Sequence, residues 1–174
     1  MDEGQEDQQD NSGMQALMKL GVFWVLFMAV IAFFFNDWNE KKHNPNQSIN
    51  QTSEGELALK RNAYGHYVTS GLINGEDVVL MLDTGASSVV IPQELADKLN
   101  LQRGYRGQAY TANGPVTTYS TLLKRLEIGN IVLTNVPASI NMGDQESDIL
   151  LGMSVLSQLD FRQSDGYLYL KPER

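Results

Sequence analysis

The residues best suited to chemistry stand in one short stretch, where the apolar run 78–82 leads directly into Asp83, Thr84 and Gly85. An apolar run of this length predicts a strand buried on both faces. A carboxylate at the end of such a strand must be paired, hydrogen-bonded or neutralised. Gly85 lets the backbone turn tightly, and Thr84 and Ser87 supply hydroxyls. We therefore expect Asp83 at the mouth of a buried turn, within reach of donors that fix its orientation.

An ordinary turn is the alternative, because Asp and Gly are common in turns. Here, however, Ala86 and Ser87 follow the glycine and a second apolar run leads away from it. A later stretch has the form of an apolar strand that ends on glycine and is followed by a short helix at 153–159. That strand consists of Ile149, Leu150, Leu151 and Gly152. Together the two stretches favour a catalytic loop over a simple turn.

These two motifs resemble those of the retropepsin-like aspartic protease family (clan AA), and in particular its bacterial membrane-anchored branch. The resemblance covers roughly residues 64–170. It implies a mainly β fold, a closed β-barrel or sandwich equivalent to half of a pepsin, with one or two short helices. It also implies that Asp83 is catalytic and that a strand supports its loop. The implied loop residues are Thr84, Gly85, Ala86 and Ser87, and the implied supporting strand is Ile149, Leu150, Leu151 and Gly152.

Residues 108–120 predict a polar hairpin with Asn113 and Gly114 at its tip. A hairpin with so few aliphatic residues cannot be central to the core. It is either an exposed edge hairpin or the flap that closes over substrate in this family. Its position between the two motifs favours a flap formed by Tyr110, Thr111, Ala112, Asn113 and Gly114.

Other local signals complete a β-rich pattern. Asn74-Gly75 predicts the hairpin that delivers the chain into Asp83, and Gly129-Asn130 predicts another over 126–140, with Pro137 at an edge or bulge. Asp165-Gly166 lacks the apolar approach of the first motif and predicts a hairpin turn. Pro92 opens a short helix that Asn100 can end.

Composition excludes several classes of function. The net charge of −8 and the absence of a basic cluster argue against nucleic-acid binding. The chain has no cysteine, which excludes disulfides, thiol catalysis and thiolate metal sites. His43 and His66 lack ligand spacing and are expected to be solvated or on a strand surface. We expect neither a metal nor a cofactor.

Four segments follow along the chain. Residues 1–15 predict a disordered acidic tail, and 16–35 a transmembrane helix of about the length that crosses a bilayer. Residues 36–56 predict a flexible linker, and 57–174 the protease domain. A cleaved signal peptide is the rival interpretation of 16–35, but no small-x-small cleavage site follows Phe35. A buried core helix is a weaker rival, because this segment is apolar on every side.

The orientation of this helix is poorly determined by charge. Lys19 precedes the span, whereas Lys41 and Lys42 follow it, which leans toward a cytoplasmic C-terminal domain. The family resemblance implies the opposite, a bacterial inner-membrane protein with a periplasmic protease domain. We follow the resemblance.

Peptide hydrolysis by this chemistry needs two carboxylates that share one proton. The chain has one Asp-Thr-Gly, and Asp144, Asp148 and Asp160 lack such a loop. A two-fold homodimer would pair Asp83 with its symmetry mate, as the resemblance implies. Retroviral members carry an Arg after the apolar-Gly motif that helps to hold the dimer, whereas Met153 stands here.

The leading hypothesis is therefore a membrane-anchored, homodimeric aspartic endopeptidase acting on polypeptides. A second is a noncatalytic, membrane-tethered module that binds peptides by strand addition. The intact Asp-Thr-Gly argues against this one. A third is a tethered structural β domain, which would leave the paired motifs unexplained.

Overall fold

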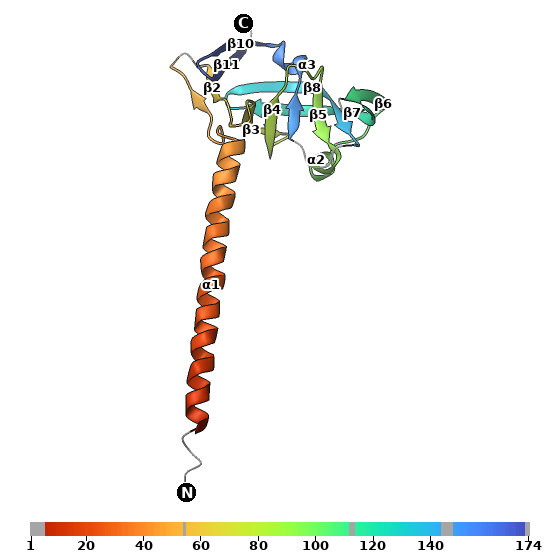
Figure 1. Ribbon diagram of the computed structural model, residues 1–174. Helices are drawn as coiled ribbons and strands as arrows, with labels where there is room; N and C mark the ends of the chain where they lie inside the picture. Colours follow the sequence, from red (N-terminus) through yellow and green to blue (C-terminus); the bar gives the residue numbers. More distant parts are fainter. Residues whose placement is uncertain (1–5, 54, 112–113, 144–147, 173–174) are drawn as a thin grey trace. The chain divides into compact units, whose positions relative to one another are not determined.

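The computed structural model describes residues 6–53, 55–111, 114–143 and 148–172. The chain divides into two compact units, Met1–Glu40 and Lys41–Arg174. The first consists of most of helix α1 (Glu6–His43), and the second contains all the strands (Figure 1).

Helix α1 is 38 residues long. Its part Gly13–His43 is long and apolar enough to cross a membrane, with a mean hydropathy of 2.3 over its most apolar window. Aromatic side chains such as Trp24 and Phe33 are exposed within this unit, as expected for a helix that is apolar all round. The helix predicted over 16–35 therefore exists, but it begins before residue 16 and ends after residue 35. The polar residues after Phe35 continue it to His43, because Asn, Glu and Lys can occupy the last turns of a helix.

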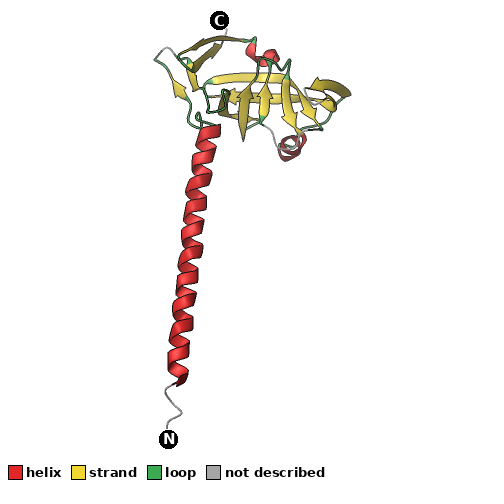
Figure 2. Cartoon of the chain, in the orientation of Figure 1, coloured by secondary structure: helices red, strands yellow, loops and turns green. Residues whose placement is uncertain are grey.

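The regular structure of the second unit is mainly strand, with two short helices, α2 and α3, and with loops between these elements (Figure 2). Its elements, in chain order, are β1 (Asn50–Gln51), β2 (Leu57–Lys60), β3 (Tyr67–Ile73), β4 (Glu76–Leu82), β5 (Val89–Pro92), α2 (Gln93–Lys98), β6 (Arg106–Thr111), β7 (Gly114–Ile128), β8 (Ile131–Asn141), β9 (Ile149–Leu151), α3 (Met153–Leu156), β10 (Leu159–Ser164) and β11 (Tyr167–Pro172).

The larger sheet has the strand order β3-β4-β9-β5-β8-β7-β6, and β3 also pairs with β7. That additional pairing, Leu72 with Glu127 and Ile73 with Leu126, closes β3, β4, β9, β5, β8 and β7 into a barrel. The predicted mainly β, closed-barrel fold is confirmed. The interior is aliphatic, and its fully buried side chains include Ile73, Leu80, Ile91, Leu123, Leu126, Ile128, Ile140, Ile149 and Leu151.

The predicted turns are found where the chain needs left-handed backbone. Asn74 and Gly75 have φ values of 53° and 91°, as a two-residue hairpin between β3 and β4 requires. Gly129 also has positive φ, and β7 pairs with β8 on either side of it. Pro137 lies in β8, which is an interior strand and not an edge strand; it pairs with Leu122 of β7 and comes just before β8 begins to pair with β5 at Ala138.

A smaller antiparallel sheet has the order β1-β2-β11-β10. Asp165 and Gly166, both with positive φ, form the turn between β10 and β11. This confirms that the second Asp-Gly is a turn and not a second catalytic loop. Helix α2 has Pro92 as its N-cap residue. Asn100, with a φ of 51°, comes just after its C-cap residue Leu99.

The segment after α1 is more ordered than a flexible linker. Asn46 is 4% exposed, and its side-chain amide donates to the carbonyls of Lys60 (2.9 Å) and Val68 (2.7 Å). Its side-chain oxygen accepts from the Lys60 N–H at 2.7 Å. Asn44 is also buried and donates to the Ser70 hydroxyl. The predicted linker over 36–56 therefore contains the end of a helix, a buried asparagine segment and strand β1.

Candidate active site

Asp83 follows the last residue of β4 and is held chiefly by backbone hydrogen bonds. Its N–H donates to the carbonyl of Leu151 at 3.0 Å, and its own carbonyl accepts from the Ala86 N–H at 3.2 Å. The Gly85 N–H donates to the carboxylate oxygen Oδ1 at 2.8 Å. The Asp83 side chain is half-buried, whereas Thr84 and Gly85 are exposed. The carboxylate is thus fixed in direction and still accessible from one side.

One expectation about this loop is wrong. Neither the Thr84 nor the Ser87 hydroxyl bonds to the Asp83 carboxylate among the residues that the structure describes; the Gly85 amide does so instead. The absence of a side chain at residue 85 lets its backbone come close to the Asp83 carboxylate, since a Cβ there would lie 3.1 Å from the carboxylate oxygen. The backbone therefore does the work that the hydroxyls were expected to do.

Strand β9 lies between the two strands that flank the Asp83 loop. It runs parallel to β4, with Leu80 opposite Ile149 and Leu82 opposite Leu151, and it pairs with β5 through Leu150. Strand β9 accepts a hydrogen bond from the Asp83 N–H and pairs with both β4 and β5. These contacts limit how far the loop between β4 and β5 can move. Residues 149–152 are therefore in direct contact with the strands and the loop around Asp83, as predicted for the supporting strand.

Gly152 explains why the supporting strand ends on glycine. A Cβ at this position would lie 2.6 Å from the Ala86 carbonyl oxygen and closer still to that of Ser88. Beyond it, the Met153 and Ser154 amides donate to the carbonyls of Ala86 (2.8 Å) and Ser87 (3.0 Å). The start of α3 is therefore locked onto the back of the loop, and no larger residue fits between them.

The predicted polar hairpin is formed by β6 and the first part of β7, which pair from Arg106–Tyr119 to Thr111–Gly114. Tyr110 is 84% exposed and Thr111 is exposed, while Gly114 has a φ of 106°. The predicted flap residues Ala112 and Asn113 lie outside the described residues.

The root of this hairpin is held by three hydrogen bonds around Ser120. The Gly104 N–H donates to its carbonyl (2.7 Å), its own N–H donates to the Tyr105 carbonyl (2.9 Å), and the Tyr105 N–H donates to its Oγ (2.9 Å). A Cβ on Gly104 would lie 2.6 Å from Ser120 Oγ. The sequence does not predict this contact, because its one local signal is a glycine before a polar strand.

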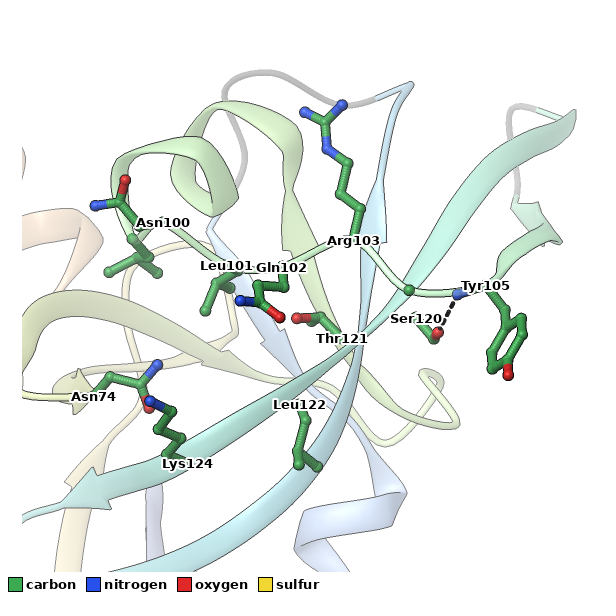
Figure 3. Close-up of a pocket in the computed structure, with 12 residues that line it drawn as sticks. Asn74, Asn100, Leu101, Gln102, Arg103, Tyr105, Ser120, Thr121, Leu122 and Lys124 are labelled. Carbon is green, nitrogen blue, oxygen red and sulfur yellow. Dashed lines mark hydrogen bonds between the residues drawn. The ribbon is translucent and has the colours of Figure 1, made fainter.

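Two cavities adjoin the hairpin root and share Tyr105 and Ser120 as walls. The smaller, about 360 Å³, reaches Ser88 of the active-site loop and Ser154 of α3. The larger, about 730 Å³, lies between residues 99–105, the β7 residues 120–124 and Asn74 (Figure 3). The Ser154 Oγ is buried and has no hydrogen-bond partner among the described residues.

The other acidic residues have different neighbours. Asp148 Oδ2 lies 2.7 Å from His43 Nε2, so His43 is not simply a solvated residue as expected. Asp160 lies 3.8 Å from Lys171 Nζ, and Asp144 lies outside the described residues. Within the described part of the chain, no group of three or more His, Asp or Glu side chains is arranged to hold a metal ion.

Comparison with known proteins agrees with this geometry. Residues 69–158 match the family of gag-polyprotein aspartyl proteases. The fold is similar to the crystal structure of a retropepsin-like aspartic protease from Rickettsia conorii, with a TM-score of 0.59 and 30% identity over 67% of this chain and 89% of that one.

Two uncharacterised bacterial proteins are also similar in sequence. One from a Sinorhizobium species is 33% identical over 116 residues, which is 64% of this chain and 50% of that protein. One from Rickettsia prowazekii is 30% identical over 110 residues, or 62% of this chain and 47% of that protein. The matched regions span about half the length of these two relatives. The family match covers both the Asp83 loop and the Gly152 strand, and the chain belongs to the retropepsin-like aspartic protease family.

Proposed function

We propose that the chain is an aspartic endopeptidase in which Asp83 works as a pair, one carboxylate from each of two copies. The observation that carries the proposal is the Asp83 loop itself. It is braced from behind by β9 and α3, yet it presents the half-buried carboxylate beside an exposed Thr84 and Gly85. In a dimer with a two-fold axis, Asp83, Thr84 and Gly85 of one copy would face the same three residues of the other copy.

The chemistry follows from the pairing. Two adjacent carboxylates cannot both ionise, so one keeps a proton and the other is charged. The charged Asp83 takes a proton from a water molecule, and that water attacks the peptide carbonyl carbon. The protonated Asp83 of the other copy donates its proton to the carbonyl oxygen. When the tetrahedral intermediate collapses, the C–N bond breaks, the leaving nitrogen takes the proton that the first Asp83 had accepted from water, and a hydroxyl of the intermediate returns a proton to the other Asp83.

The Gly85 amide has a specific part in this scheme. Its hydrogen bond to Asp83 Oδ1 holds that oxygen in place and leaves the other to face the partner or the water. Thr84 would stabilise the contact between the two loops, and the β6–β7 hairpin would act as the flap over bound substrate. The substrate is accordingly a polypeptide in extended form.

We also propose that α1 anchors the protein in a bacterial inner membrane, with the protease domain in the periplasm. The length and hydropathy of the segment Gly13–His43 support the anchor. Met153 offers no charge for holding two copies together, so association in solution would be weak. Confinement to a bilayer raises the effective concentration of copies and favours pairing.

The decisive experiment uses the full-length chain in detergent micelles with a fluorogenic peptide library at pH 4 to 7. Asp83→Asn should abolish cleavage, because an amide can neither share the proton nor act as a base. Asp77→Asn is the matched control, since Asp77 is an exposed acid at the opposite end of the same strand. This control should retain full activity.

Pairing is tested with mixtures of the two proteins. Excess Asp83→Asn chain should inhibit the wild type by forming inactive mixed dimers, whereas excess Asp77→Asn should not. Specific activity should fall when the wild type is diluted to concentrations at which dimers dissociate. Full activity of Asp83→Asn would refute the catalytic role of Asp83, and unchanged activity of a demonstrated monomer would refute the pairing.

A further inference from the structure

The larger of the two cavities at the hairpin root has no role in the proposed chemistry. Its floor is formed by β7, and its walls by residues 99–105 and by Asn74 of the β3–β4 turn. Asp83 is not among its lining residues, and the turn at Asn74 stands at the opposite end of β4 from Asp83. The cavity is therefore separate from the reacting groups.

The lining of this cavity combines apolar side chains with polar ones, of which Asn74, Asn100 and Ser120 are hydrogen-bonded elsewhere. Leu122 is 54% exposed beside it, and Leu99 and Leu101 are half-buried. Figure 3 shows the Gln102 amide and the Thr121 hydroxyl pointing toward one another across the cavity. Neither of these two side chains has a hydrogen bond to another residue within the described ranges.

The charge in the cavity is of one sign. Its charged residues are Arg103 and Lys124. Arg103 already bonds to Asp97 at 2.7 Å. Lys124 has no ion pair with any residue in the described part of the chain, and Figure 3 shows it on the β7 wall near Asn74. The Lys124 ammonium group can attract an anionic group locally, although the net charge of the chain as a whole is −8.

The position of the cavity indicates what carries the anionic group. The smaller cavity begins at Ser88, in the active-site loop, and the two cavities share Tyr105 and Ser120. An extended polypeptide leaving the Asp83 loop at Ser88 would meet the smaller cavity first and the larger one beyond Tyr105 and Ser120. Apolar contacts, side-chain amides and one cation suit a segment in which an apolar residue neighbours Asp or Glu.

From this continuity we infer that the Lys124 cavity is an exosite, which binds an acidic segment of the polypeptide substrate at a distance from the cleaved bond. The inference rests on the proposed protease function and adds a determinant of specificity to it. It predicts that substrates are selected partly by charge outside the residues adjoining the scissile bond. Lys124 acts in binding and takes no part in the chemical step.

The test compares extensions of one short peptide that the full-length enzyme cleaves in micelles. The peptide is extended, on either side and through Gly-Ser spacers of several lengths, with Leu-Asp-Asp or with Leu-Asn-Asn. At least one acidic extension should lower KM relative to its amide counterpart. Lys124→Glu should raise that KM about three- to tenfold, as expected for reversing one solvent-accessible charge pair. It should leave kcat and the cleavage of the unextended peptide unchanged.

Lys60→Glu is the matched control. Lys60 is exposed on β2, outside the cavity, and Lys60→Glu changes the net charge by the same amount as Lys124→Glu. Equal effects of the two variants, or equal KM values for the acidic and amide extensions, would overturn the exosite.

Binding separates this proposal from the proposed activity. Fluorescence anisotropy of labelled acidic peptides on Asp83→Asn protein requires no catalysis. Weaker binding to Asp83→Asn/Lys124→Glu than to Asp83→Asn/Lys60→Glu would support the exosite even if no substrate were cleaved. Equal binding to both would reject it even in an active protease.

Discussion

The Asp83 loop and the β6–β7 hairpin are both short polar excursions from the barrel, but they are held in opposite ways. The loop is enclosed by β4, β9 and α3, with Gly152 at a point where a side chain would not fit. The hairpin is exposed along most of its length and is secured at its root by three hydrogen bonds around Ser120. The proposed reacting group therefore lies on the more enclosed part, and the element that would contact substrate is freer to adjust.

The strongest way to break this contrast is to disturb the packing behind the loop. Gly152→Ala should lower the free energy of unfolding by about 3 kcal/mol, since the added methyl meets two carbonyl oxygens that β5 and the loop hold in place. Any cleavage activity should be lost with it. Chemical denaturation and peptide cleavage measure the two effects.

Gly21→Ala provides the control for that substitution. A Cβ on Gly21 meets nothing within 4 Å, and alanine favours a helix over glycine, so the same chemical change should cause no loss of stability or activity. If Gly152→Ala behaved like Gly21→Ala, the loop would not be the rigid region described above.

Hydrogen exchange on the unmodified protein compares the two regions directly. The amides of Asp83 and Met153, which donate to Leu151 and Ala86, should exchange near the rate of global unfolding. The amides of Tyr110 and Thr117 in the hairpin should exchange orders of magnitude faster and slow when a peptidic inhibitor binds. Slow exchange in the free hairpin, unchanged by inhibitor, would contradict a mobile flap.

A smaller effect is expected at the hairpin root. Gly104→Ala places a methyl 2.6 Å from Ser120 Oγ, a side-chain atom that can turn away, and 3.0 Å from the Ser120 carbonyl. We expect a stability loss of about 1 kcal/mol and a larger change in KM than in kcat. Adding Ser120→Ala removes the nearer clash, so the double variant should be less destabilised than the sum of the singles. Strict additivity would show that the two residues do not contact each other.

The smallest effect concerns pH at the barrel end of β7. The hydrogen bond from Arg125 to Glu127 lowers the pKa of the Glu127 carboxyl below its ordinary value of 4.5. The ionised carboxylate then favours the folded state above pH 4.5, and this contribution disappears as pH falls through the lowered pKa. Glu127→Gln should be slightly less stable than wild type at pH 6, and the difference should shrink as the pH is lowered below 4.5. If the stability difference between wild type and Glu127→Gln grew as the pH was lowered, the lowered pKa of Glu127 would be contradicted.

Local signals in the sequence predicted much of the fold and site. The Asn74-Gly75 and Asp165-Gly166 turns, the apolar approach to Asp83 and the Gly152 strand each depend on residues close together in the chain. The closed barrel follows from the family to which these motifs belong.

What could not be predicted depends on contacts between distant residues. His43 and Asp148 are 105 positions apart, and the hydrogen bonds of Asn46 reach β2 and β3. An asparagine in a polar segment has the same composition whether it is solvated or buried, so the sequence indicated a linker there. The Gly85 amide was missed for a related reason, since every residue but proline carries such a donor.

The buried asparagines after α1 bear on how two copies could meet. A flexible chain over 36–56 would let its ends separate by roughly 25 Å and would allow the barrel to turn in any direction. Here Asn44 and Asn46 are bonded to β2 and β3, so this part of the segment belongs to the folded unit and adds no length to a tether. When two copies pair, these residues are already ordered, and no conformational entropy is lost in ordering them.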